Sequence, residues 1–176
     1  LTNASNAFYG CEALESLPSE MFKGAAAKLS NLSSMFSGCT SLKSVPDGLF
    51  GFIAARNANF LNCFSACTSL KSVGADVFPS TVSTTGLNNT FSGCTSLTDI
   101  SGKVFSKCGS VTTLMRTFYG CTALETLPSD LFAGMVKVNK FYQTFSGCTS
   151  LESIPEDLFA KNTAANNFSK MFYECV

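Results

Sequence analysis

The chain has 176 residues, of which 45% are hydrophobic and 14% are charged, and its 12 basic side chains balance its 12 acidic ones. Such a composition is that of a globular protein and excludes a disordered tail. Because there is no basic run, the charge pattern gives no footprint for nucleic acid or for an anionic membrane. No apolar segment approaches the roughly 18 residues needed to span a bilayer, and residues 1–10 lack the basic and apolar regions of a signal peptide.

A phenylalanine returns every 27 or 28 residues, at Phe8, Phe36, Phe64, Phe91, Phe118, Phe145 and Phe172. The third residue after each one is a cysteine: Cys11, Cys39, Cys67, Cys94, Cys121, Cys148 and Cys175. Leucine and then an aliphatic residue follow at further steps of three, and each unit closes on a pair such as Leu49-Phe50. The consensus is F-x-G-C-x-x-L-x-x-[LVI]-P-x-x-[LVM]-F. A period of this length is typical of a solenoid or a repeat array.

Fixed apolar positions separated by variable polar ones are what stacked coils require, since each coil buries the same side chains against its neighbours. The segment from the leucine to the aliphatic residue, such as 42–45, predicts one short parallel strand per coil. Prolines follow at Pro18, Pro46, Pro128 and Pro155, and the acidic residues after them predict a short helix. A second apolar series is expected to pack the opposite wall, as helix or as strand: Leu32, Phe60, Leu87, Leu114, Phe141 and Phe168.

This pattern resembles the BspA-like leucine-rich repeats of bacterial cell-surface proteins, in which F-x-G-C-x-S-L units recur. The resemblance covers essentially the whole chain. The period is longer than is usual in that family, and the unit looks more like the related repeats of mycoplasma and gut-bacterial surface lipoproteins. The fold implied is an α/β repeat solenoid, a right-handed leucine-rich-repeat coil with one short parallel strand and short helical segments in each repeat.

We expect residues 1–176 to form a single solenoid of about six repeats. They start near Phe8, Phe36, Phe64, Phe91, Phe118 and Phe145, and a partial seventh starts at Phe172. Neither end shows the polar cap that solenoids need for solubility. We therefore expect the chain to be a segment of a larger repeat protein, whose signal peptide would lie elsewhere.

The nine cysteines raise the question of a disulfide framework or a metal site. The seven in register should form a ladder of parallel side chains, a poor match to disulfide geometry, so we expect free, buried thiols that pack as small hydrophobes. Only Cys63 and Cys108 stand outside the ladder. Zinc would want four converging ligands, and the chain has neither histidine nor a C-x-x-C pair, so no metal or cofactor is expected.

The lack of histidine also excludes Ser-His-Asp and Cys-His catalytic arrangements, and we expect no enzymatic activity. Pairs of carboxylates remain, such as Glu156 with Asp157, and they are interpreted as charges at a helix N-terminus. The glycines of F-x-G-C are interpreted as tight turns and not as a phosphate-binding loop.

The most informative variable position follows the repeat leucine: Glu15, Lys43, Lys71, Thr98, Glu125 and Glu152. On the predicted strands these residues form one exposed row. Like charges directly opposite each other are unfavourable by up to about 1 kcal/mol, so stability does not explain the neighbours Lys43–Lys71 and Glu125–Glu152. The row is a candidate partner-binding face, and an ordinary solvated surface is the alternative.

Repeat solenoids present long faces that vary while the core stays fixed, which suits recognition. The resemblance implies an extracellular or cell-surface bacterial protein that binds host matrix proteins, host receptors or other cells, and not nucleic acid. Two alternatives remain open at this point. The repeats could be a spacer that displays another domain, or a carbohydrate-binding module in which sugars stack on Tyr9, Tyr119 and Tyr173, each of which follows a repeat phenylalanine.

Overall fold

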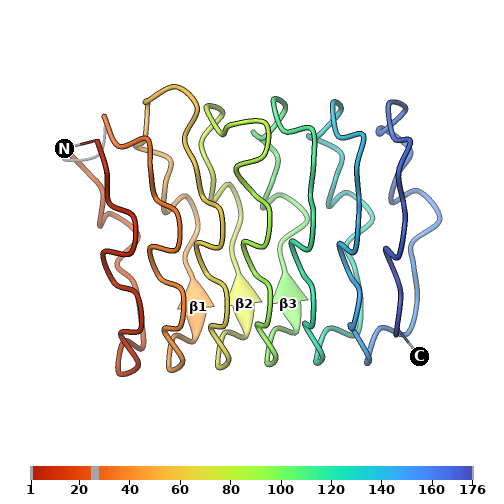
Figure 1. Ribbon diagram of the computed structural model, residues 1–176, viewed down its shortest axis with the longest axis horizontal. Helices are drawn as coiled ribbons and strands as arrows, with labels where there is room; N and C mark the ends of the chain where they lie inside the picture. Colours follow the sequence, from red (N-terminus) through yellow and green to blue (C-terminus); the bar gives the residue numbers. More distant parts are fainter. Residues whose placement is uncertain (1, 25–27, 176) are drawn as a thin grey trace.

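The repeats wind into coils that stack along one axis, so that equivalent positions of successive repeats lie side by side (Figure 1). This computed structural model describes residues 2–24 and 28–175, and residues 1, 25–27 and 176 of the predicted solenoid lie outside that description. The two chain termini lie at opposite ends of the stack. Each coil is named below by its repeat phenylalanine.

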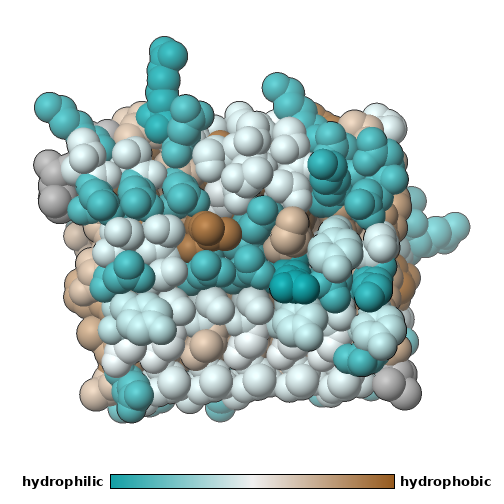
Figure 2. Space-filling view, viewed as in Figure 1, coloured by the Kyte–Doolittle hydropathy of each residue, from teal (hydrophilic) through white to brown (hydrophobic). Residues whose placement is uncertain are grey.

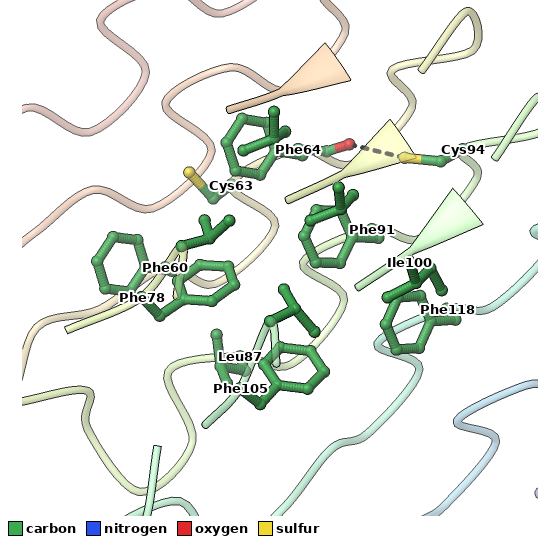
Figure 3. Packing of buried hydrophobic residues seen from close by; sticks show 14 of the residues in the cluster. Phe60, Cys63, Phe64, Phe78, Leu87, Phe91, Cys94, Ile100, Phe105 and Phe118 are labelled. Carbon is green, nitrogen blue, oxygen red and sulfur yellow. Dashed lines mark hydrogen bonds between the residues drawn. The ribbon is translucent and has the colours of Figure 1, made fainter. Parts of the chain in front are cut away.

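The repeat phenylalanines form a column of stacked rings inside the coils. The rings of Phe64 and Phe91 lie 5.6 Å apart at an angle of 3°. The other neighbours in the series lie 5.2–5.6 Å apart, so the column runs from the first coil to the last. Phe78 belongs to a second column and meets Phe91 edge-on at 6.2 Å, a favoured aromatic geometry (Figure 3). Equal spacing of the rings along the axis explains why the sequence keeps its period.

The parallel sheet has three strands, β1 (Ser44–Val45), β2 (Ser72–Val73) and β3 (Asp99–Ile100), in the order β1-β2-β3 (Figure 1). Ser44 pairs with Ser72 and Val45 with Val73, so equivalent repeat positions are in register. The predicted parallel strand is therefore found, but in three coils.

Proline sets the limits of this sheet. The N–H of Gly74 donates to the Val45 carbonyl and the N–H of Ser101 to the Val73 carbonyl, each at 2.9 Å. The equivalent positions in the other repeats are Pro18, Pro46, Pro128 and Pro155. Proline has no N–H to donate to a ladder. The pairing consequently holds only where glycine or serine replaces it.

The predicted helical segments are not confirmed: the described residues contain no helix, and so none that could cross a membrane. The chain after each proline forms tight turns, as where Leu131 N–H donates to the Pro128 carbonyl at 3.2 Å and Ala133 N–H to the Asp130 carbonyl at 3.0 Å. In the Phe36 coil, the Phe50 N–H donates instead to Val77 of the next coil. Proline and an acidic residue favour a turn as well as a helix start, and bonding to the neighbouring coil leaves too few N–H groups for a helix.

The opposite wall is neither helix nor strand. It consists of overlapping turns over residues 3–10, 31–38, 59–66, 86–93, 113–120, 140–147 and 167–174, which we call the turn wall. In each coil the residues two before and two after the repeat phenylalanine have positive φ, as with Asn89 (54°) and Gly93 (74°) beside Phe91. The second apolar series lies on this wall, and it is buried except at Phe168, which is 43% exposed.

Backbone hydrogen bonds alternate in direction along the turn wall. Phe64 N–H donates to Thr90 of the next coil at 2.9 Å, whereas Cys67 N–H donates back to the Phe64 carbonyl of its own coil at 3.4 Å. The same alternation recurs in the other coils. Both kinds of backbone group are satisfied, as burial demands, and every second residue ties one coil to the next.

Candidate partner-binding surface

The six residues of the predicted strand row are all exposed in the structure. Backbone bonds place them on adjacent coils: Lys43 N–H donates to Glu15, Lys71 N–H to Lys43 and Thr98 N–H to Lys71, at 2.9–3.1 Å. Glu152 N–H likewise donates to Glu125 at 3.0 Å. We call Glu15, Lys43, Lys71, Thr98, Glu125 and Glu152 the strand row.

An ion pair between Lys43 and Glu15 sets how charge is distributed along the strand row. Lys43 Nζ lies 2.6 Å from Glu15 Oε2, and the hydrogen bond and charge of Lys43 lower the pKa of Glu15. Lys43 therefore turns toward Glu15 and away from Lys71, which relieves the like-charge contact expected from the sequence. Both partners are more than 60% exposed, so the pair contributes little to stability. What remains is a basic centre at Lys71 and an acidic end at Glu125 and Glu152.

A shallow depression of about 590 Å³ lies over the three strands beside the row. Ser44, Ser72, Asp99, Ser101 and Gly74 are among the residues that line it, together with Asp47. Asp47 accepts a hydrogen bond from Ala75 N–H at 2.7 Å and lies so close to Gly74 that a side chain there would collide with it. This depression was not predicted from the sequence. The sequence feature that marks the depression is the replacement of the repeat proline by Gly74 and Ser101.

The cysteine ladder has a structural role that the sequence did not predict. Cys94 Sγ donates to the Phe64 carbonyl of the preceding coil at 3.2 Å (Figure 3), and the same bond recurs at five other coils over 3.0–3.2 Å. Burial raises the pKa of Cys67 and of Cys148 to about 12. These thiols stay protonated, as donation requires. Within residues 2–24 and 28–175 no group of three potential metal ligands gathers.

The tyrosines named as sugar-stacking candidates lie on the turn wall, away from the strand row. Tyr9, Tyr119 and Tyr173 are 64%, 39% and 52% exposed. The structure adds Tyr142 to them, because the Arg116 guanidinium lies over its ring at 6.0 Å and over the Tyr119 ring at 5.6 Å. Tyr142 was not predicted from the sequence because it lies three residues before its repeat phenylalanine, whereas the other three tyrosines directly follow theirs.

No protein-family model and no curated protein matches this chain. Solved structures similar to it include a leucine-rich repeat protein from Bacteroides ovatus, at 23% identity over 87% of this chain and 52% of that one, with a TM-score of 0.30. Another is the leucine-rich repeat protein of T. pallidum, at 24% identity over 86% of this chain and 61% of that one, with a TM-score of 0.31.

A third similar structure is a leucine-rich cell surface protein from Faecalibacterium prausnitzii, at 20% identity over 94% of this chain and 62% of that one, with a TM-score of 0.20. The chain thus spans about half to three fifths of these proteins. They are bacterial leucine-rich repeat proteins, as the repeat motif led us to expect. The solenoid itself is established by the ring column and the bonds between coils, because likenesses at these TM-scores are too loose to support it.

Proposed function

We propose that this chain is a non-catalytic interaction scaffold of a bacterial cell surface, and that the strand row and its depression bind a protein partner of the host or its matrix. The observation that carries the proposal is the strand row itself: six exposed residues at one position of successive coils, with a basic centre and an acidic end. Complementary charge on a partner gives orientation and association rate more than raw affinity.

The depression supports the same assignment. A small side chain of the partner can enter where Gly74 and Ser101 replace proline, while Asp99 and the serines of β1 and β2 offer hydrogen bonds. The like-charged neighbours Glu125 and Glu152 have no described cation paired with them, so a basic partner group would relieve their repulsion.

The test is binding of the purified chain to a panel of extracellular-matrix proteins, at low and at physiological salt. A variant carrying Lys43→Glu, Lys71→Glu, Glu125→Lys and Glu152→Lys reverses the strand row. A matched control reverses four exposed charges elsewhere, with Lys137→Glu, Lys161→Glu, Glu156→Lys and Asp157→Lys. We expect saturable binding that the first variant loses and the control keeps.

Equal loss in both variants would show that net surface charge, and not the strand row, governs the binding. A chain that binds nothing on the panel would favour the spacer, in which the repeats only hold another domain away from the cell.

A further inference from the structure

The outer surface of the turn wall changes character along the stack. In the first four coils it carries no charged side chain, and its outward positions are mainly serine and asparagine. All four charges of the wall lie in the Phe118, Phe145 and Phe172 coils: Arg116, Lys140, Lys170 and Glu174. Figure 2, which faces the turn wall, shows a mostly polar surface with hydrophobic side chains only in small isolated patches.

The tyrosines follow the same division. All four tyrosines of the chain lie on the turn wall, and three of them lie in the charged coils. Each of those coils therefore contributes one aromatic ring and one cation, which together we call the tyrosine band: Arg116, Tyr119, Lys140, Tyr142, Lys170 and Tyr173. Tyr9 stands alone at the other end, with no cation in its coil's part of the wall.

Contacts between cations and rings join five members of the tyrosine band: Arg116, Tyr119, Tyr142, Lys170 and Tyr173. Arg116 lies over two rings and donates from Nε to Gln143 Oε1 at 2.7 Å. Gln143 is itself only 9% exposed, so a buried side chain holds the Arg116 guanidinium in place. Lys170 Nζ lies 5.6 Å from the centre of the Tyr173 ring. Among the described residues no carboxylate pairs with Arg116, whose terminal nitrogens are left to bind an anion.

The backbone conformation at three positions of the band and its support favours other residue types, which indicates a role beyond folding for the side chains found there. Arg116, Gln143 and Lys170 occupy the left-handed position before the repeat phenylalanine, with φ of 53°, 52° and 54°. The equivalent residues in three of the first four coils are asparagines, which adopt this conformation more readily. Non-glycine residues held there cluster at binding sites, where surrounding structure maintains them. Three consecutive coils thus accept a less suitable residue and gain a longer polar side chain.

We propose that the tyrosine band binds an anionic polysaccharide. The exposed rings of Tyr119 and Tyr173 suit the apolar faces of sugars, and the cations beside them suit the carboxylates or sulfates of an acidic glycan. This surface is separate from the strand row and does not depend on its function.

The acidic residue of the wall makes the band asymmetric. Glu174 follows Tyr173 directly, is exposed, and opposes an anion at that end. Binding should therefore depend most on Arg116, which sits between two rings, and less on Lys170. An acidic peptide is a poorer match, because it offers no flat apolar face to the exposed rings of Tyr119 and Tyr173.

The experiment measures binding of the whole chain to polygalacturonate by titration calorimetry, at low and physiological salt. Fully methyl-esterified polygalacturonate has the same backbone without the charge, and polyglutamate has the charge without the sugar. Test variants take residues that other coils use at the same positions: Arg116→Asn, Tyr119→Ser and Lys170→Asn. Tyr9→Ser is the matched control, since Tyr9 has the same place in its repeat but lies outside the band.

We expect Arg116→Asn and Tyr119→Ser each to weaken binding of polygalacturonate by about tenfold or more, Lys170→Asn to weaken it less, and Tyr9→Ser to leave it unchanged. Thermal unfolding should show Arg116→Asn as stable as the parent. The proposal is overturned if polygalacturonate does not bind, if the ester or polyglutamate binds equally well, or if Tyr9→Ser is as damaging as Tyr119→Ser. Binding lost with the strand-row variant alone would assign the polysaccharide to the other wall.

Discussion

The turn wall and the strand side belong to the same coils but differ in how far they tolerate sequence change. On the turn wall, alternate N–H groups bond to the next coil from the Phe8 coil to the Phe145 coil, whatever the outward residues are. On the strand side, the β ladder is confined to three strands, because four of six repeats place proline where an N–H is needed. The turn wall therefore carries the continuity of the stack.

The difference separates two kinds of surface. The strand side can change its backbone, as at Gly74 and Ser101, and so forms a depression. The turn wall keeps its backbone constant and changes only side chains that point outward, as at Arg116 and Tyr142. Its uniform spacing suits a repeating ligand, whereas the irregular strand side suits a partner of individual shape.

The largest expected effect is alkaline unfolding caused by ionisation of the buried thiols, most of which directly follow the turn wall. Burial, with smaller contributions from neighbouring charges, raises the pKa of Cys67, Cys108 and Cys148 from 9.0 to about 12. A thiol whose pKa is higher in the folded chain favours folding fully below pH 9 and loses that contribution as the pH rises toward 12. Each such thiol then costs about 1.4 kcal/mol per pH unit. Urea unfolding under reducing conditions should show stability falling steeply above pH 9.

The control for this prediction is Cys108→Val, which removes one titrating thiol outside the ladder and should make the decline less steep. A free energy of unfolding that stays level up to pH 11 would show that the thiols are accessible in the folded protein.

The next largest effect compares the aromatic column with the sheet. Phe91→Ala removes a fully buried ring stacked on both sides, and should lower the free energy of unfolding by about 3–5 kcal/mol. Val73→Ala in β2 removes two buried carbons at a cost of about 2 kcal/mol. Chemical denaturation of both variants measures the difference. Equal losses would contradict the view that the column and the turn wall dominate.

A smaller loss is expected from Gly74→Pro. The change removes the N–H that bonds to Val45 and introduces atoms beside Asp47, for a total of about 1–3 kcal/mol. Amide exchange should show protection of Ser101 retained while β1 becomes less protected. Loss of protection along the whole turn wall would mean that the sheet, and not the wall, holds the coils together.

Much of this architecture follows from the period of the sequence, and the exceptions have identifiable causes. The phenylalanine column and the exposure of the strand row were predictable, since repeat position alone determines what stacks on what. The helices were wrong because proline followed by an acidic residue fits a turn equally well. The turns of the turn wall could not be predicted, because half of its left-handed positions hold Asn, Ser, Arg, Gln or Lys. These residues do not indicate a positive φ as clearly as glycine does.

The candidate sites show the same limit. The strand row was visible as one variable position in a fixed frame. The depression needed the observation that two repeats lack the proline, and its consequence depends on where Asp47 lies in the neighbouring coil. The contact of Arg116 with Tyr142 joins different positions of different repeats, so alignment of the repeats by register could not bring the two together.

The smallest expected effect is also the most direct test of the role of proline. Pro128→Ser gives the Phe118 coil the residue that Ser101 provides one coil earlier, and its N–H can donate to the Ile100 carbonyl as Ser101 does to Val73. The added bond of about 1 kcal/mol is offset by the greater freedom of the unfolded chain, so the net change should stay within about 0.5 kcal/mol. Amide exchange should nevertheless detect a protected N–H at position 128. If that amide exchanges freely although the stability is unchanged, proline is a consequence of the sheet's end and not its cause.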